Sequence, residues 1–177
     1  MMAVRKVIYV DDDRLRQKAK KVKNFTAGLK QLAQDMLETM RSYQGVGLAG
    51  PQIGVMQRLF VAEIPAGRGD GAEPHPQSGR SYVLINPEIV KTSAELVEGQ
   101  EGCLSIPNWQ GLVERPQWLE IKAQDVNGRK IKLKVDDYLA RIFSHEVDHL
   151  NGVLFTDHIK DPAKLWPVEN GEPAALE

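Results

Sequence analysis

The first periodic stretch of apolar residues predicts a helix near the N-terminus. Apolar residues recur at the spacing of one helix face, at Leu29, Leu32, Met36 and Met40. Thr26 precedes them as a candidate N-cap, because its hydroxyl can accept a hydrogen bond from a free N–H of the first turn. We expect the helix to end before Gly45, where two nearby glycines make continuation costly.

A second helical pattern begins at Asp136 or Asp137. Its apolar positions are Leu139, Ile142, Phe143 and Leu150. Gly152 is expected to end this helix, since glycine readily adopts the positive φ that follows many helix C-termini.

Shorter patterns predict strands. Residues 58–64 and 82–86 are rich in β-formers, and residues 65–80 between them carry Gly, Pro and polar residues without periodicity, so we expect a mobile loop there. Apolar and polar residues alternate over 119–123 and again over 131–135. Asn127 and Gly128 lie between these runs, which predicts a hairpin with positive φ at both residues.

These elements assign the chain to the α+β class, with mainly antiparallel strands packed around a central helix and a further helix near the N-terminus. Residues 1–177 are expected to form a single domain. From about residue 161 the chain is rich in Pro and Gly, and we expect an irregular tail.

Composition narrows the class of protein. The chain has 23 Lys and Arg against 24 Asp and Glu, so its overall charge gives no sign of nucleic-acid binding. A basic run at residues 14–23 is interpreted as a solvated surface, with docking to an anionic partner as the alternative. One cysteine, no apolar run of about 20 residues and no signal peptide in residues 1–10 predict a cytoplasmic protein outside the membrane.

The sharpest chemical signal is HExxH at residues 145–149, within the second predicted helix. Residues four apart lie one turn above each other, so His145 and His149 can bind one metal ion. Glu146 is offset around the helix and can act on a water bound to that ion. The alternative is two histidines satisfied by hydrogen bonds beside a surface glutamate.

A three-ligand catalytic site needs one more protein ligand. Downstream, Phe155 stands where some zinc proteases have a third histidine, and it cannot bind a metal. Glu169 has a plausible spacing but a poor helical context, and nothing around His158 supports ligation. Cys103 lies upstream after a glycine, and its thiolate is a good ligand for borderline and soft ions. An isolated cysteine is more often an inert core residue, but the absence of a strong downstream candidate favours Cys103 as the third ligand.

Three motifs in order, GVGLAGPQIG at 45–54, EGCLS at 101–105 and HEVDHLNG at 145–152, resemble the signature motifs of the peptide deformylases. The resemblance extends over roughly residues 5 to 160. It implies a hydrolase that removes the N-formyl group from the initiator methionine of nascent proteins, releasing formate. It further implies formyl-methionyl peptides and nascent chains as substrates, a location near the ribosome, and Fe²⁺ as the ion, with Zn²⁺, Ni²⁺ or Co²⁺ as alternatives.

The resemblance also implies roles for individual residues. It gives the metal ligands as Cys103, His145 and His149, and the catalytic groups as Glu146, the Gln52 amide and the Leu104 N–H. It gives the substrate-binding residues as Val46, Gly47 and Ile142. It pairs Glu101 with Arg115 behind the Cys103 loop.

The chain departs from the family pattern near the site. Gly50 replaces a common alanine, which is expected to loosen the loop that carries Gln52. Ser144 replaces a common glutamine, which removes a hydrogen bond that could form near the site. Asp11 and Asp13 replace the usual N-terminal prolines, far from the chemistry. No catalytic group is lost.

Two other functions compete with this interpretation. A zinc endopeptidase would cleave internal peptide bonds, and Phe155 and the thiolate position disfavour it. A non-catalytic module with a closed structural metal site would need a fourth protein ligand, for which the remaining histidines, His75 and His158, are the candidates.

Overall fold

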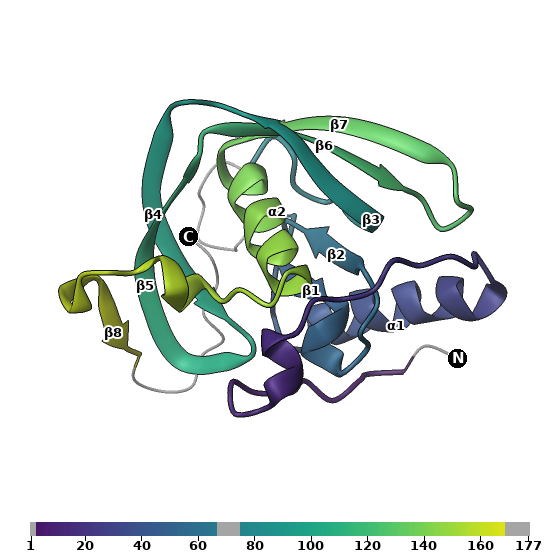
Figure 1. Cartoon of the computed structure of the whole chain (residues 1–177), viewed down its shortest axis with the longest axis horizontal. Helices are drawn as coiled ribbons and strands as arrows, with labels where there is room; N and C mark the ends of the chain where they lie inside the picture. Colours follow the sequence, from purple (N-terminus) through teal and green to yellow (C-terminus); the bar gives the residue numbers. More distant parts are fainter. Residues whose placement is uncertain (1–2, 67–74, 169–177) are drawn as a thin grey trace.

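The helix that carries the HExxH motif, α2 (Asp137–Leu150), lies at the centre of the fold with strands on several sides (Figure 1). The computed structural model describes residues 3–66 and 75–168. A second helix, α1 (Ala27–Ser42), lies closer to the N-terminus. The strands are β1 (Gly47–Ala49), β2 (Leu59–Glu63), β3 (Ser81–Thr92), β4 (Leu96–Cys103), β5 (Ile106–Pro116), β6 (Trp118–Gln124), β7 (Lys130–Asp136) and β8 (Leu165–Pro167).

The strands form two sheets in which the paired strands run antiparallel. The larger sheet has the order β1-β2-β3-β6-β7, and the smaller has the order β4-β5-β8. Helix α2 contacts strands of both sheets. This arrangement confirms the α+β class and the central position of the motif-bearing helix.

The apolar face of α2 is confirmed as the centre of the largest hydrophobic cluster. Leu139, Ile142, Phe143 and Leu150 are fully buried. The ring of Phe143 meets the edges of Phe60 and Tyr82, with centroids 5.2 and 5.4 Å apart. Gly152 has a φ of +75° directly after the C-cap, so the predicted end of the helix is confirmed.

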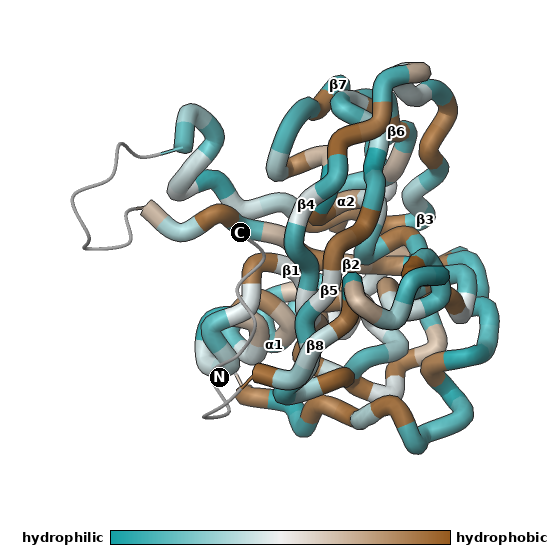
Figure 2. Tube along the Cα trace, turned by 90° about the vertical axis from the view of Figure 1, so that its left-hand side faces the viewer, coloured by the Kyte–Doolittle hydropathy of each residue, from teal (hydrophilic) through white to brown (hydrophobic). Residues whose placement is uncertain are grey.

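Helix α1 matches its sequence pattern. The Thr26 hydroxyl accepts a hydrogen bond from the Leu29 N–H at 3.3 Å, so Thr26 is the N-cap. Leu29, Met36 and Met40 are buried in a second cluster together with residues of β1 and β2. Hydrophobic and hydrophilic residues can be followed along the chain in Figure 2.

The strand predictions were partly wrong. The expected strand at 58–64 is confirmed as β2, but the one at 82–86 continues to Thr92 in β3. It passes Asn86, which has a φ of +52°, where the register with β6 shifts. Strands β4 and β5 were not predicted at all. Leu96 and Val97 are exposed at the start of β4, so no alternation of buried and exposed residues marks it.

Two turns also differ from expectation. The β6–β7 hairpin is confirmed, but five residues, 125–129, separate the strands, and Gly128 has a positive φ whereas Asn127 does not. The Asp125 carboxylate accepts hydrogen bonds from the N–H groups of Asn127 and Arg129, which stabilises the longer loop.

In the tail, residues 162–167 form a 3₁₀ turn and strand β8, so this part is not irregular; residues 169–177 lie outside the described residues. Most of the loop expected at 65–80 also lies outside them, at 67–74.

Candidate metal centre and active site

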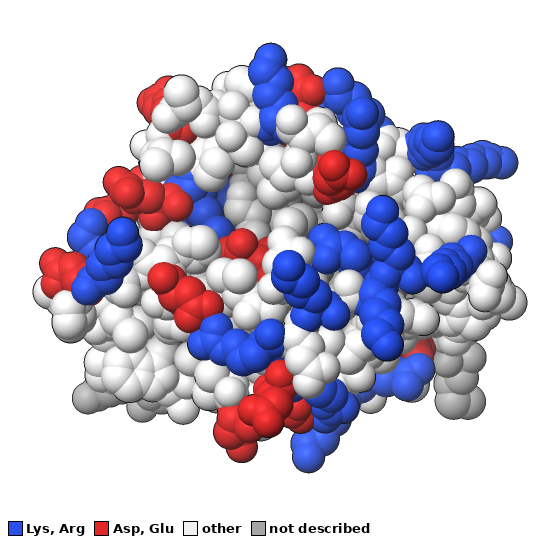
Figure 3. Space-filling view, viewed as in Figure 1, with Lys and Arg blue, Asp and Glu red and all other residues white. Residues whose placement is uncertain are grey.

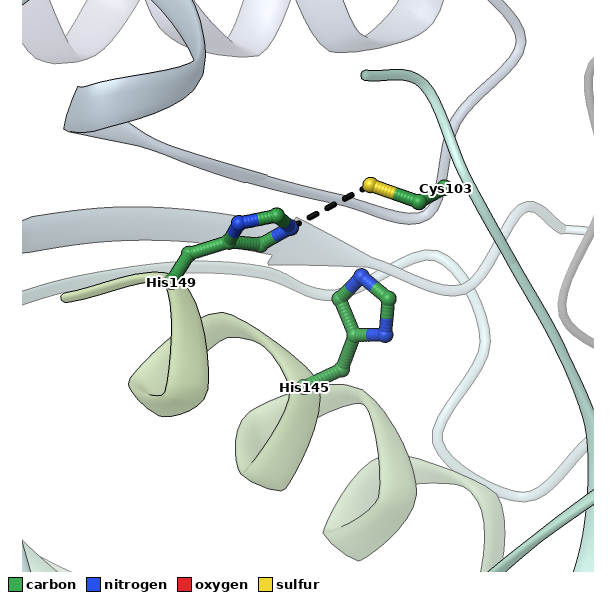
Figure 4. A group of neighbouring side chains, drawn as sticks. All are labelled: Cys103, His145 and His149. Atoms are coloured by element: carbon green, nitrogen blue, oxygen red, sulfur yellow. Dashed lines mark hydrogen bonds between the residues drawn. The ribbon is translucent and has the colours of Figure 1, made fainter. Parts of the chain in front are cut away.

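Three side chains from two elements converge next to α2. His145 and His149 project from successive turns of the helix, and Cys103 faces them from the end of β4 (Figure 4). One potential ligand atom from each residue lies within 4.8 Å of the others, and the Sγ of Cys103 is 3.2 Å from Nε2 of His149. All three residues are at least 95 % buried. The structure thus brings together the three predicted ligands.

A buried carboxylate fixes the orientation of His145. Nδ1 of His145 donates to Glu101 at 2.9 Å, which leaves Nε2 free for a metal. Arg115 donates to both Glu101 oxygens at 2.8 and 2.9 Å. Burial by itself would raise the pKa of Glu101, but the hydrogen bonds from Arg115 and His145 hold it well below its usual range. Glu101 is therefore ionised, and the predicted pair with Arg115 is present.

Arg141 is a member of this network that sequence reasoning missed. It lies four residues before His145 on α2 and is only 6 % exposed. Its guanidinium donates to Glu101 at 2.9 Å and to the carbonyl oxygens of Val113 at 2.8 Å and Val97 at 2.6 Å. The available signal was a charged residue within the apolar stretch of the predicted helix, one turn before the first histidine.

The donor set fits a divalent cation. Burial lowers the pKa of His149 well below its ordinary value, so this ring is neutral, the form that binds metals. Burial opposes the charged form of His145, but Cys103 and Glu101 raise its pKa, so a cation there displaces a proton. Two imidazoles and a thiolate suit borderline transition metals. The buried Nδ1 of His149 has no hydrogen-bond partner among the described residues.

Glu146 lies beside the cluster and not within it. It is 2 % exposed, and one of its oxygens, Oε2, has no hydrogen-bond partner among the described residues. Burial raises its pKa to about 7. A Cβ at Gly47 would lie 2.2 Å from the other oxygen, Oε1, so glycine is required there for Glu146 to occupy its position. Glu146 can therefore both accept and donate a proton near neutral pH.

The Gln52 side chain points its amide nitrogen toward the cluster. Its oxygen accepts a hydrogen bond from the Ala49 N–H at 2.8 Å, which fixes the orientation of the amide. Its nitrogen lies 3.6 Å from Sγ of Cys103 and 3.4 Å from Oγ of Ser105. The amide nitrogen of Gln52 is thus held beside the three-residue cluster.

A small cavity joins the predicted catalytic groups. Its volume of about 20 Å³ has room for a water molecule. The lining includes Val46, Gly47, Gln52, Cys103, Leu104, His145 and Glu146. Ile142 does not line it: this residue is fully buried in the same hydrophobic cluster as Val46. The structure therefore places two of the three predicted substrate-binding residues at the cavity.

The two departures from the family pattern have local explanations. A Cβ at Gly50 would lie 2.7 Å from the Val55 carbonyl oxygen and 2.8 Å from that of Gln57, so the glycine permits close packing of this turn. The expected loosening of the loop at Gly50 stays a prediction. The Ser144 hydroxyl donates to the Ala140 carbonyl at 2.8 Å within α2, so its polar atom is satisfied.

The other candidate ligands lie elsewhere. His158 is 2.7 Å from Asp148 and lies partly exposed outside the three-residue group. Phe155 stacks on the ring of His145 at 6.1 Å, and His75 packs against Tyr138. Glu169 lies outside the described residues. Within the described ranges, the metal-binding group contains Cys103, His145 and His149 without a fourth His, Cys, Asp or Glu, which disfavours a closed structural site.

Comparison with known proteins identifies the family. Residues 4–165 match the family described as polypeptide deformylase. The chain belongs to the polypeptide deformylase family. It is 47 % identical over 172 residues to a peptide deformylase of Chloroflexus aurantiacus, covering 93 % of this chain and 92 % of the relative. It is 44 % identical to one of Thermomicrobium roseum, covering 99 % and 97 %.

Solved peptide deformylases share the fold. One from Synechococcus elongatus, in complex with actinonin, aligns with a TM-score of 0.80 and 41 % identity, covering 90 % of this chain and 80 % of that one. One from Acinetobacter baumannii, with Met-Ala-Ser bound, aligns with a TM-score of 0.81 and 36 % identity, covering 90 % and 100 %. As a peptide deformylase, the chain is a hydrolase that acts on formyl-methionyl peptides. Among the described residues, no helix is long and apolar enough to cross a membrane.

Proposed function

We propose that the deformylase activity of this chain resides in the cavity between α2, β4 and the segment that follows α1. Cys103, His145 and His149 hold one divalent ion, and Glu146 transfers protons. The observation that carries this proposal is the buried Glu146 oxygen that has no hydrogen-bond partner among the described residues. It lies beside three side chains whose potential ligand atoms are within 4.8 Å of one another, and beside a cavity with room for a water.

Glu146 acts first as a general base. When bound, a divalent ion would act as a Lewis acid and lower the pKa of a water molecule beside Glu146. Glu146 accepts the water proton as the oxygen attacks the formyl carbon. It then donates this proton to the departing amine, so formate and a free N-terminus are released. A carboxyl group with a pKa of about 7 suits both steps.

Negative charge develops on the formyl oxygen during the attack. The Gln52 amide, whose oxygen is held by Ala49, donates to that charge, and the Leu104 N–H is the second donor. One such donor typically lowers the barrier by about 2.7–4 kcal/mol. Glu101 and Arg115 contribute by holding His145 in one orientation.

The methionine side chain of the substrate binds next to Val46 and Gly47, with Ile142 supporting Val46 from the core. An apolar wall of this kind disfavours an acidic side chain, because burying an unpaired carboxylate is costly. We expect formyl-Met and formyl-norleucine peptides to have a much higher kcat/KM than formyl-Asp peptides. Equal values for Met and Asp substrates would contradict this placement.

The donor set bears on the identity of the ion, and the substrate bears on where the protein acts. We propose Fe²⁺ as the ion, with Zn²⁺, Ni²⁺ and Co²⁺ as the alternatives that two imidazoles and a thiolate also accept. Iron would make the activity sensitive to oxygen. Because the substrates are newly made chains, we place the protein in the cytoplasm, near the ribosome, as a single domain.

The test combines metal analysis with a formate-release assay on protein purified without oxygen. We expect about one ion per chain and formate release from formyl-Met-Ala-Ser, with no reaction on acetyl-Met-Ala-Ser. A casein digest run in parallel addresses the endopeptidase alternative. Casein cleavage without formate release, or full activity in protein stripped of metal, would overturn the proposal.

A further inference from the structure

A second, larger cavity lies over the outer side of β3, β6 and β7. Its volume is about 510 Å³, and it shares no lining residue with the cavity at the metal ligands. Four lysines line it: Lys21, Lys122, Lys130 and Lys132. Glu88 is the only acidic residue in this lining. The lysines come from the basic run at residues 14–23 and from two neighbouring strands, so we call this feature the lysine groove.

Hydrogen bonds through Asn86 join the two parts of the groove. The Val22 N–H donates to the Asn86 side chain at 2.8 Å, and the Asn86 amide donates to the Val22 carbonyl at 2.9 Å. The same amide donates to the Gln124 side chain at 2.8 Å. On the other side of Lys21, the Lys20 N–H donates to the Met56 carbonyl. Lys21 therefore projects from a segment whose backbone is fixed on both sides.

The groove carries excess positive charge. Lys132 pairs with Glu120 at 2.8 Å. Within the described ranges, Lys21, Lys122 and Lys130 have no ion-pair partner within 4 Å, and all three are exposed. Lys and Arg side chains gather on the right-hand half of the face in Figure 3, over the N-terminal segment and the end of the β6–β7 hairpin of Figure 1. The overall charge of the chain is −1, so this charge is local.

We propose that the lysine groove binds the phosphodiester backbone of structured RNA. Lys130 and Lys132 are two residues apart on β7 and face the same side, about 6.7 Å apart along the strand. Side chains at this spacing can contact separate phosphates of one nucleic-acid backbone. The lining contains no aromatic side chain on which a base could stack. Recognition is therefore of the backbone and independent of sequence.

The lining of the groove disfavours a lipid surface. A lipid surface would need exposed apolar side chains beside the lysines to enter the bilayer, and the apolar residues of the lining, Ala123 and Ile131, are buried or half-buried. An acidic peptide is the remaining alternative, and the competition with poly-glutamate described below tests it.

The test measures binding of a fluorescein-labelled RNA hairpin by anisotropy between about 50 and 200 mM salt. The variant is Lys21→Gln/Lys122→Gln/Lys130→Gln in the full chain. Each lost phosphate contact reduces the log–log salt slope by about 1, so we expect a reduction of about 3 and an affinity at least about tenfold lower. Formate release from a short formyl-Met peptide should be unchanged.

The matched control removes three exposed lysines outside the groove, in Lys6→Gln/Lys30→Gln/Lys160→Gln. It should keep the wild-type affinity and salt slope. Equal losses in the two variants, or no binding by the wild type at low salt, would overturn the proposal. Two further probes are poly-glutamate and phosphatidylglycerol vesicles. Competition by either as effective as that of unlabelled RNA, at equal charge concentration, would also overturn it.

Discussion

One oxygen of Glu146 distinguishes this residue from the side chains around it. Cys103, His145 and His149 face one another, whereas Oε2 of Glu146 is buried without a protein partner among the described residues. An unsatisfied buried carboxylate oxygen is costly unless another group satisfies it. A water between Glu146 and the metal ligands would do so. Two substitutions separate proton transfer from metal binding.

The first prediction is that Glu146→Ala keeps the metal and loses turnover. General acid–base catalysis typically contributes about 10²–10⁴-fold, so kcat and kcat/KM should both fall by at least that much. Metal content and kcat are measured on the same preparation. Glu114→Ala, at an exposed position of β5, is the control and should remain active. Near-normal turnover in Glu146→Ala with metal present would contradict the mechanism, and loss of metal would instead make Glu146 a ligand.

The second prediction is that Cys103→Ala loses most of the metal and keeps its fold. The thiolate is one of the three proposed ligands, while the sheets and helices depend on other contacts. Metal analysis gives the occupancy, and circular dichroism checks the fold. Cys103→Ser, with a harder and weaker ligand, should retain an intermediate amount. Full occupancy in Cys103→Ala would exclude Cys103 as a ligand.

At the scale of elements, the sequence patterns predicted both helices well and the smaller sheet poorly. Thr26 and Gly152 mark helix ends through local features that can be predicted from the sequence, a side-chain N-cap and a glycine with positive φ. Strand β4 instead depends on its antiparallel pairing with β5, and its exposed start leaves no local pattern. The same sheet supplies Cys103, Glu101 and Arg115, so the motifs identified residues of the site whose structural element was not predicted.

Arg141 links α2 to this sheet, because it bonds Glu101 and carbonyl oxygens of β4 and β5. The third prediction is that Arg141→Leu lowers the free energy of unfolding by about 3–5 kcal/mol, since it removes a partner of a buried carboxylate. It should also weaken metal binding about 10–100-fold, because Glu101 orients His145. Urea unfolding and the rate of metal loss to a chelator measure the two effects.

A conservative variant keeps this prediction testable if Arg141→Leu does not fold. Arg141→Lys keeps the charge near Glu101 but cannot reach all the carbonyl oxygens at once. It should fold and lose metal at a rate between those of the wild type and Arg141→Leu. Arg129→Leu, on the exposed hairpin loop, should match the wild type in both measurements. Wild-type metal retention in a folded Arg141→Leu protein would show that Arg141 has no role in orienting the ligands.

At the scale of the whole molecule, the N-terminal segment is held to the fold through contacts that no local pattern revealed. Buried Val7 belongs to the second hydrophobic cluster, which contains the apolar face of α1, and the Ile8 N–H donates to the Gln52 carbonyl. Asp35 of α1 is a further anchor and is 2 % exposed. It accepts hydrogen bonds from Arg5 at 2.7 and 3.0 Å and from the Ala3 N–H at 3.0 Å. A polar residue on the buried side of a helix is the signal that sequence reasoning passed over.

The fourth prediction concerns how stability depends on pH through Asp35. Hydrogen bonds from Gln31, Arg5 and the Ala3 N–H lower the pKa of Asp35 from its ordinary value of 3.8. A carboxyl group with a lowered pKa in the folded state contributes stability that is fully present above pH 3.8 and is lost as the pH falls through the folded value. Asp35→Asn should therefore reduce the free energy of unfolding by about 1–3 kcal/mol at pH 7, because it weakens bonds to a charged acceptor. The difference in the free energy of unfolding between variant and wild type should shrink as the pH falls below 3.8.

Urea midpoints at neutral and acidic pH measure this difference, with Asp11→Asn, at an exposed carboxylate, as the control. A difference that stays constant down to the lowest pH at which the protein folds would mean that Asp35 stabilises the molecule by its shape and not by its charge.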